Sequence, residues 1–429
     1  MKRSRLLAGF MAITMAFSML TACGGGASAE EAGGEEKITL KVSLWDYSNT
    51  EYYKTMFDAF TAKYPNITVE VVEFSADEYD NTVTTQLGGK QDFDVVFTKG
   101  TPALSALIAQ GHVLALDDYI AKDTEFSKDN YLGLIDQLTM DGKTYGVPYR
   151  KDNYLIYYNK DLFDQAGVAY PEDGMTMAEY HEIAAKMTSG SGNDKIYGAH
   201  THTWPSNVYD YARRTEVFEQ LDKESYMSLK PYYEEMLAMQ DEGIVQDFGA
   251  LKSSNIHYSG VFYNQQVAML EIGTWFINMC IENVKDFNWG VCCLPNNEGM
   301  GNTNAVGGVT PVSIGAYGKH PDEAWKFITY ICGEEGAELI AQTGIVPGYN
   351  SDKISQIFDD LPKIYPNVPE NLSKYIDVDK YVVEQLMDKL TKEIDNILLE
   401  QHSAIMTKSV TVDEGLEKFY ERVAEAQSK

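Results

Sequence analysis

The sequence predicts an α/β fold that is divided into two lobes. Strand and helix patterns alternate through residues 38–111, as they do in a sheet covered by helices. The chain has 429 residues, too many for one small domain. Hydrophobic residues make up 44% of it, which is ordinary for a soluble protein and sufficient for a large core.

The first strand and helix are the clearest elements. Residues 38–45 (ITLKVSLW) alternate as a strand does. Ser48 and Glu51 have the spacing of a capping box, which predicts a helix over 51–64 that Pro65 ends. Four aromatic residues in this helix keep helical spacing, so we expect them in the core and not against a ligand. They are Tyr53, Phe57, Phe60 and Tyr64.

The alternation continues through two more strands. Residues 67–74 (ITVEVVEF) and 93–97 (FDVVF) are expected to be strands. Helices are expected near 78–87 and at ALSALIAQG, where Gly111 is the stop signal.

Polar and aromatic side chains follow the predicted strands. Trp45, Asp46 and Tyr47 come at the end of the first strand, and Thr98 and Lys99 follow the third. Ligands of open α/β sheets usually bind at the carboxyl ends of strands. These five residues are therefore candidate ligand contacts.

The composition narrows the classes of partner. The formal net charge is −29, so the surface repels nucleic-acid backbones and anionic lipid headgroups. Aromatic residues make up 12% of the chain, and 29 of them are tyrosines. We expect no nucleic-acid partner.

The N-terminus has the features of an export signal. A basic start precedes an apolar run over 6–20, which is too short to span a bilayer comfortably. Leu20-Thr21-Ala22-Cys23 resembles the lipobox of bacterial lipoproteins, with cleavage before Cys23 and lipid on its thiol. The alternative is a plain secretory signal with a chance cysteine. We expect a signal peptide over 1–22 and a flexible, glycine-rich acidic tether over 23–36, with no later transmembrane helix.

Four cysteines remain beyond Cys23. Cys292 and Cys293 are adjacent in an apparent strand, so their side chains point to opposite faces, and no CxxC spacing is present. We expect buried thiols at Cys280, Cys292, Cys293 and Cys332, with one long-range disulfide as the alternative.

Residues 145–160 (YGVPYRKDNYLIYYNK) combine five tyrosines with charged side chains. This segment and four others follow one another along the chain in an order that resembles the extracellular solute-binding proteins of ABC sugar importers, the group that includes maltose-binding protein. The similar segments are VSLWDYSNTEYYKTMFDAFTAKYPNITVEVV, DGKTYGVPYRKDNYLIYYNKDLFDQAG, QQVAMLEIGTW, AVGGVTPVSIGAYGKHPDEAWKFITYICGEEG and TVDEGLEKFYERVAEA. They span essentially the whole mature chain. Asn264 and Gln265 depart from the pattern, because the family often has glycine there, and they leave the local turn geometry open.

The resemblance implies a two-lobed periplasmic-binding-protein-like fold of type II, with a ligand cleft between lobes that a hinge joins. Lobe 1 would contain 37–149 and 306–352, and lobe 2 would contain 150–305 and 353–429. The implied function is carbohydrate binding for an ABC permease, with an oligosaccharide as the expected ligand. The protein would be a lipid-anchored monomer on the extracytoplasmic face of the membrane. Aromatic rings would stack on the apolar faces of the sugar, and charged groups would hydrogen-bond its hydroxyls.

The same resemblance places several residues in the cleft. Tyr149, Arg150 and Asp152 would face it from the first crossing between the lobes. Strand alternation puts Tyr154 and Ile156 on one face and Leu155 and Tyr157 on the other, so the later tyrosines are expected mainly in the core of lobe 2.

Three aromatic residues are further candidates for stacking. Trp275 follows Gly273, which would let the backbone approach a ligand, although core packing is its alternative role. Trp204 lies in the polar loop AHTHTWPSN, and Tyr375 aligns loosely with a stacking tryptophan of maltose-binding protein. We expect Trp289 and Trp325 to be core residues.

Other functions have weaker support in the sequence. His200 and His202 are two residues apart, but no cysteine or carboxylate cluster completes a zinc set, so no metal or cofactor is expected. No GxSxG or Walker-A pattern is present, and we expect no enzyme. The alternatives are a surface sugar sensor or adhesin without transport, and a secreted glycoside hydrolase.

Overall fold

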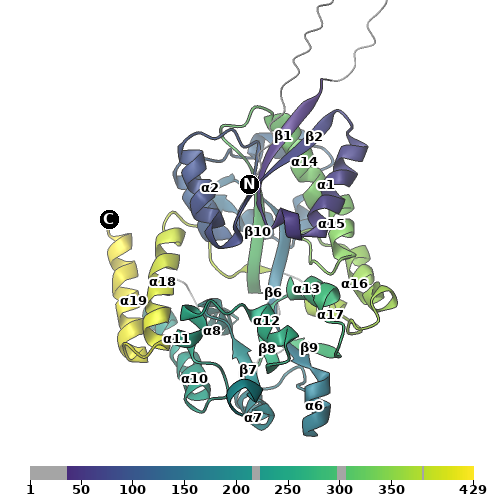
Figure 1. Ribbon diagram of the computed structural model, residues 1–429. Coiled ribbons are helices and arrows are strands. Elements are labelled where there is room, and N and C mark those ends of the chain that lie inside the picture. Colours follow the sequence, from purple (N-terminus) through teal and green to yellow (C-terminus); the bar gives the residue numbers. More distant parts are fainter. Residues whose placement is uncertain (1–35, 215–222, 297–305, 379–380) are drawn as a thin grey trace, which may run out of the picture. The chain divides into compact units, whose positions relative to one another are not determined.

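The computed structural model describes residues 36–214, 223–296, 306–378 and 381–429. The predicted signal peptide, Cys23 and nearly all of the tether lie outside these residues. The fold described here is that of residues 37–429, which form one contact unit. It begins with the expected strand–helix alternation (Figure 1). The first elements are β1 (Ile38–Trp45), α1 (Glu51–Lys63), β2 (Ile67–Phe74), α2 (Tyr79–Gly88), β3 (Val95–Phe97) and α3 (Thr101–Ala109).

The strands of this first part are parallel. β1 pairs with β2 along its whole length, from Ile38 opposite Ile67, and pairs with β3 on its other side. Alternate side chains of β1 enter the core, where Leu40, Val42 and Leu44 have no exposed surface. Full burial of such a side chain contributes roughly 1.5–3 kcal/mol. The predicted strand is confirmed.

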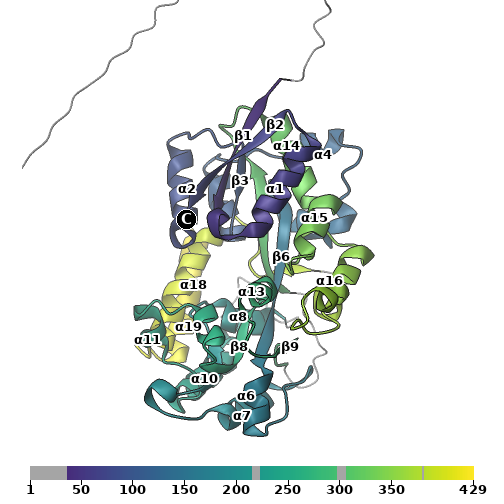
Figure 2. The same ribbon diagram turned by 45° about the vertical axis from the view of Figure 1, so that its right-hand side comes forward.

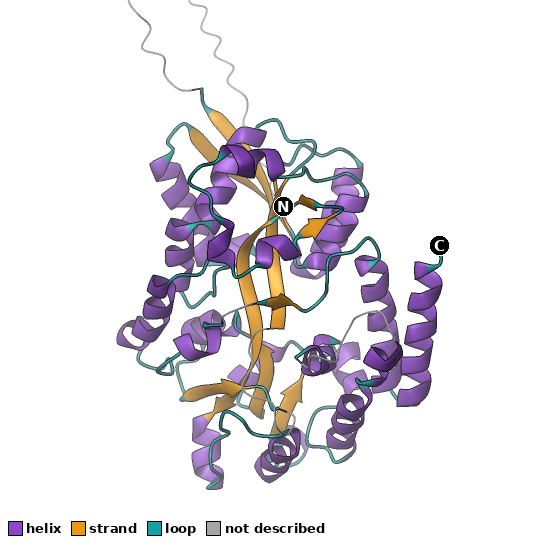
Figure 3. Cartoon of the chain, turned by 180° about the vertical axis from the view of Figure 1, so that it is seen from behind, coloured by secondary structure: helices purple, strands orange, loops and turns teal. Residues whose placement is uncertain are grey.

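One mixed sheet continues through the rest of the unit, in the order β2-β1-β3-β10-β6-β8-β7. β10 is antiparallel to both β3 and β6, and β6 is antiparallel to β8 and β9. Figure 3 shows the two long strands, β6 and β10, running from one part of the sheet into the other. The strands are β6 (Val147–Asn159), β7 (Tyr197–Thr201), β8 (Val267–Gly273), β9 (Trp289–Cys293), β10 (Val306–Ile314) and β11 (Val382–Val383), with β4 (Thr139–Met140) and β5 (Lys143–Thr144) as a separate hairpin.

Helices cover the sheet around these strands (Figure 2). They are α4 (Asp117–Lys122), α5 (Leu134–Gln137), α6 (Lys160–Ala166), α7 (Met177–Met187), α8 (Ser206–Arg213), α9 (Lys223–Met227), α10 (Lys230–Asp241), α11 (Phe248–Ser253), α12 (Tyr258–Tyr263), α13 (Phe276–Asn283), α14 (Pro321–Cys332), α15 (Glu334–Ala341), α16 (Asp352–Ile364), α17 (Ser373–Ile376), α18 (Thr391–Met406) and α19 (Val412–Gln427). Short 3₁₀ turns occupy Tyr47–Asn49, Ala76–Glu78, Lys128–Tyr131 and Gly192–Asp194.

Three hydrophobic cores lie along the sheet. The first core contains buried side chains of β1, β3, α1, α2 and α14, among them Phe60 and Phe327. The second core contains those of α7, α8, α10, α18 and α19, among them Tyr180 and Phe419. The third core contains those of α12, α13 and α16, among them Phe276 and Phe358.

Strand β6 connects all three cores. Its early residues Val147 and Tyr149 belong to the first core. Further along, Tyr154 and Ile156 enter the second core, whereas Leu155 and Tyr157 enter the third. The predicted alternation of these four residues between two faces is confirmed.

The predicted capping box before α1 is wrong. Thr50, and not Ser48, precedes the helix, and its side chain forms no capping hydrogen bond. Ser48 lies in the 3₁₀ turn, where its backbone N–H donates to Glu73 Oε1 of β2 (3.0 Å) and its hydroxyl donates to the same carboxylate. A carboxylate from the neighbouring strand thus takes the place of the local partner. Capping boxes do occur at α7, with Thr176 and Glu179, and at α19, with Thr411 and Glu414.

Helices α18 and α19 pack together as a C-terminal hairpin, visible at the left of Figure 1. They bury side chains in the second core, but α18 also packs on α3 beside the first core. Thr101 and Ser105 of α3 donate hydroxyl hydrogen bonds of 2.7 Å to the carbonyls of Gln385 and Asp388. Tyr381 and Val383, which the sequence assigns to lobe 2, also lie in the first core.

Two expectations about buried residues are confirmed. Cys280, Cys292, Cys293 and Cys332 are buried free thiols. Trp289 and Trp325 are 1% and 7% exposed, respectively. At the departure from the family pattern, Gln265 has φ of +55°, the left-handed conformation that glycine adopts most readily.

Candidate functional site

A cavity of about 890 Å³ opens where the first core faces the second and third cores. Side chains from the end of β1, from β6 and β10, and from α12 and α13 surround it. Its volume is at the upper end of the range for small-molecule sites. Its lining contains Trp45, Asp46, Asn49, Thr50, Tyr52, Tyr53, Ala76, Lys99, Arg150, Asp152, Tyr154, Trp204, His257, Tyr258, Trp275, Asn278, Met279, Glu282, Asn283, Gly308, Val309, Thr310, Ile345 and Glu384.

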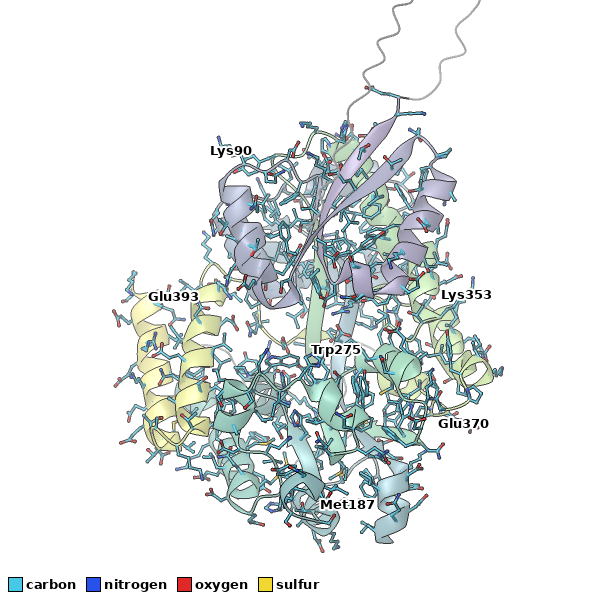
Figure 4. The ribbon with its side chains drawn as sticks, in the orientation of Figure 1. Lys90, Met187, Trp275, Lys353, Glu370 and Glu393 are labelled. Atoms are coloured by element: carbon cyan, nitrogen blue, oxygen red, sulfur yellow. The ribbon has the colours of Figure 1, made fainter. Side chains whose placement is uncertain are left out.

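Aromatic rings form one wall of the cavity. Trp275 lies in the turn between β8 and α13 and is partly buried (Figure 4). Its indole N–H donates to the Tyr258 hydroxyl (2.9 Å), and its ring centroid is 6.0 Å from that of Trp204 and 5.7 Å from that of Tyr154. These contacts fix the orientation of the indole ring before any ligand arrives.

Gly273 is required for the position of Trp275. A methyl group at Gly273 would overlap the six-membered part of the indole ring. The expected close approach of a ligand to the backbone at Gly273 is therefore replaced by the Trp275 ring, for which the glycine makes room.

The opposite wall lies at the carboxyl end of β1. Trp45 packs on Tyr79, with ring centroids 4.8 Å apart, and the ammonium of Lys99 lies 5.4 Å from the Trp45 ring. Lys99 also donates to the carbonyl of Ala76. Asp46 has φ of +53°, a left-handed conformation that turns the chain out of the strand at the cavity.

A buried ion pair lies on β6 at the cavity. Arg150 Nε is 3.2 Å from Asp152 Oδ2 and donates to Thr310 Oγ1 (3.1 Å), while Thr274 donates to the other oxygen of Asp152 (3.4 Å). Burial raises the pKa of Asp152, although Arg150 opposes this effect. Burial alone would lower the pKa of Arg150, but Asp152 and nearby tyrosines hold it above its ordinary value. Such a pair offers fixed partners to hydroxyl groups.

Seven of the eleven predicted ligand contacts line the cavity, and four do not. The seven are Trp45, Asp46, Lys99, Arg150, Asp152, Trp204 and Trp275. The expected orientation of Tyr149 toward the cleft is wrong, because it has no exposed surface and lies in the first core. Alternation along β6 sends Arg150 and Asp152 to the cavity and Tyr149 to the opposite face.

The other three residues outside the lining each have a packing role. Tyr47 stacks on Phe57, with ring centroids 5.8 Å apart. Thr98 is 1% exposed and donates to the Pro311 carbonyl. Tyr375 is 5% exposed, lies in the third core and donates to the Val291 carbonyl (3.0 Å).

Several lining residues were not predicted. Tyr258 is the first residue of α12 and His257 precedes it, in a stretch where the sequence analysis predicted no element. Glu282 lies on α13 and is one of many acidic residues in the chain. Glu384 follows the two-residue strand β11. Its buried Oε2 has no hydrogen-bond partner among the described residues, and burial, together with Asp395 and Asp152, raises the pKa of its carboxyl group to about 7. The sequence contains no signal for this environment.

His200 and His202 both contact neighbouring side chains of the protein. His200 is buried on β7 and contacts Gln246, and the ring of His202 packs edge-on against Trp204, which lines the cavity. Within the described part of the chain, no cluster of histidine, cysteine or carboxylate side chains could hold a metal ion. Over the same residues, no helix has the length and apolar character needed to cross a membrane.

Comparison with known proteins agrees with this architecture. Residues 47–338, more than half of the chain, match the family model described as bacterial extracellular solute-binding protein. A sugar transporter from Rhizobium etli, solved in an open conformation, is 34% identical, with a TM-score of 0.74 over 90% of this chain and 99% of its own.

Two further proteins are similar to this chain. A substrate-binding protein from Listeria monocytogenes in complex with cycloalternan is 20% identical, with a TM-score of 0.76 over 92% of this chain and all of its own. The sn-glycerol-3-phosphate-binding periplasmic protein of Rhizobium meliloti (strain 1021) is 23% identical over 75% of this chain and 78% of its own. The two-lobed α/β fold and the family match together establish that the chain belongs to the bacterial extracellular solute-binding proteins.

Proposed function

We propose that this protein captures a carbohydrate in the cavity and delivers it to the membrane permease of an ABC importer. The single observation that carries the proposal is the arrangement of Trp45 on one wall, Trp204 and Trp275 on the other, and the Arg150–Asp152 pair on β6. The 34% identity to a sugar transporter over nearly its whole length supports the same ligand class.

The chemistry of a saccharide matches this arrangement. Its rings have apolar C–H faces, on which tryptophan and tyrosine stack with large contact area and few torsions to freeze. Its hydroxyl groups meet the charged partners of the Arg150–Asp152 pair, and hydrogen bonds to charged groups are stronger than neutral ones. A cavity of about 890 Å³ leaves room for more than one sugar ring, so an oligosaccharide is the proposed ligand.

The cavity walls belong to different cores, which supports a closing mechanism. Trp45 is part of the first core, whereas Trp275 packs against the second and third. A ligand that contacts both walls would stabilise the form in which they approach each other. We propose that the lobes are 37–149 with 306–352 and 150–305 with 353–429, apart from Tyr381 and Val383, which pack in the first core, and that their crossings form the hinge.

The family is extracellular, so the site of action is extracytoplasmic. We further propose that lipid on Cys23 anchors the protein, as a monomer, to the outer face of the cell membrane. The 13 residues that follow Cys23, up to Glu36, are rich in glycine and acidic side chains, and they would serve as the tether between the anchor and the folded unit. The proposed role is binding and not catalysis, in keeping with a family of binding proteins.

Calorimetry with a panel of neutral oligosaccharides, on a soluble form lacking residues 1–36, tests the ligand class. We expect at least one saccharide to bind, to raise the melting temperature through mass action, and to reduce the radius of gyration in X-ray scattering. If no saccharide binds, the carbohydrate assignment is wrong. Tight binding with an unchanged scattering profile would instead contradict only the closing mechanism.

A further inference from the structure

The cavity lining contains more acidic than basic side chains. Both permanent cations of the lining, over the described residues, are already engaged by the protein. Arg150 pairs with Asp152 (3.2 Å), and Lys99 donates to the Ala76 carbonyl. Four carboxyl groups share the lining with these two cations. They are those of Asp46, Asp152, Glu282 and Glu384.

Glu384 differs from the other three carboxyl groups in its surroundings. Its side chain reaches the cavity beside Gly308 of β10. Its buried Oε2 accepts no hydrogen bond from the described residues, and a buried acceptor without a donor is costly. A hydroxyl or ammonium group of a ligand would supply the missing donor.

The groups behind Glu384 are also acidic. Asp210 of α8 is 1% exposed, and both its carboxylate oxygens lack hydrogen-bond partners among the described residues. Glu271 of β8 has no exposed surface, and its Oε1 lacks a partner as well. Asp152 and Asp395 are the further charged neighbours that act on Glu384. Burial raises the pKa of Asp210 and of Glu271, which favours their uncharged forms, and Arg213 and Arg214 also act on Asp210. The like charge that an anion beside Glu384 would meet is therefore that of Glu384 itself, Asp152 and Asp395, in a region where low polarisability strengthens the repulsion.

We propose that Glu384 is a ligand-binding residue that accepts hydrogen bonds from the bound saccharide and makes the cavity select saccharides without acidic groups over acidic ones. The proposal rests on the carbohydrate-binding function proposed above. It also predicts weak binding of glycerol 3-phosphate, because the lining has two cations for four carboxyl groups and Arg150 is paired with Asp152.

Affinity measurements on matched ligands test the proposal. Maltotriose, cellotriose and mannotriose serve as neutral probes, with trigalacturonate, trimannuronate and glycerol 3-phosphate as acidic ones. Calorimetry at pH 8 keeps the Glu384 carboxyl group mostly ionised, since its pKa is about 7. The tightest neutral trisaccharide should bind at least about tenfold more tightly than any acidic probe, as expected for like-charge repulsion.

Glu384→Gln separates the carboxylate charge from side-chain size. This variant should reduce the neutral-to-acidic preference about tenfold, and Glu282→Gln should shift it in the same direction. Glu393→Gln is the matched control, because Glu393 is exposed on α18 and lies outside the cavity lining (Figure 4). The apo melting temperature of Glu384→Gln should not fall, since the buried Oε2 has no hydrogen-bond partner to lose among the described residues.

Each contrary result has a distinct meaning. Equal binding of acidic and neutral saccharides would overturn the selectivity while leaving the carbohydrate function intact. An unchanged preference in Glu384→Gln would show that Glu384 is not the residue responsible. If no probe binds, neutral or acidic, the carbohydrate function fails and this proposal fails with it.

Discussion

Replacing Trp275 with alanine should weaken saccharide binding more than it weakens the folded protein. A fully buried aromatic side chain contributes roughly 1.5–3 kcal/mol. Trp275 is already partly buried against Tyr154 and Trp204, so only the remaining face of its ring is left for a ligand. We therefore expect the lower value, about 1.5 kcal/mol, which is about a tenfold loss of affinity.

The same change has a smaller, separable effect on stability. The variant loses the hydrogen bond from the indole N–H to Tyr258 (2.9 Å), worth about 1 kcal/mol, and part of the ring packing. Calorimetry gives the affinity and fluorescence gives the apo melting temperature of the same variant. Trp289→Ala is the control, because Trp289 is 1% exposed and its truncation should cost about 3–5 kcal/mol of stability. If Trp275→Ala behaves like Trp289→Ala, with near-normal affinity in the folded fraction, the proposed stacking role is wrong.

Three further predictions follow from single residues. Gly273→Ala should displace the Trp275 ring and lower saccharide affinity about tenfold, whereas Gly260→Ala, which has open space around it, should not; calorimetry compares them. Burial raises the pKa of Glu271 to about 8, so its contribution to stability is full below about pH 4.5 and is lost as pH rises through 8. Between pH 6 and 8, the unfolding free energy of the wild type should therefore fall by about 2 kcal/mol more than that of Glu271→Gln, as measured by urea titrations. Cys23→Ser should abolish labelling by a fatty-acid analogue in cells; equal labelling of both proteins would contradict the lipid anchor.

The local parts of the fold were predictable because their signals are local. The limits of β1 and β2 agree with the predicted ranges, since each has alternating side chains between polar turns. The capping box at Ser48 failed for the opposite reason. Its partner, Glu73, comes from the neighbouring strand, 25 residues away, and no local pattern reveals a competing contact of that kind.

The candidate site was predictable only where the alternation of side chains along a strand decides which residues face the cavity. Arg150 and Asp152 share a face of β6, and the same alternation, applied to Tyr149, would have placed it in the core. Glu384 could not have been recognised, because its surroundings come from β6, β10, α8 and α18, which are distant in sequence. The role of Gly273 likewise depends on where the Trp275 ring folds back, which spacing alone does not determine.

The pairing of β3 with β10 has a consequence for synthesis of the chain. Val95 pairs with Ile314, 219 positions later in the sequence. At about 5–20 residues per second, a ribosome needs about 10–45 s to make the intervening segment. Throughout that interval β3 lacks its antiparallel neighbour, and the first core lacks the part that β10 and α14 supply. Such non-local pairing also slows folding after synthesis. The first core therefore cannot close until the ribosome has made the chain as far as Ile314, which keeps the nascent chain incompletely folded over most of its synthesis.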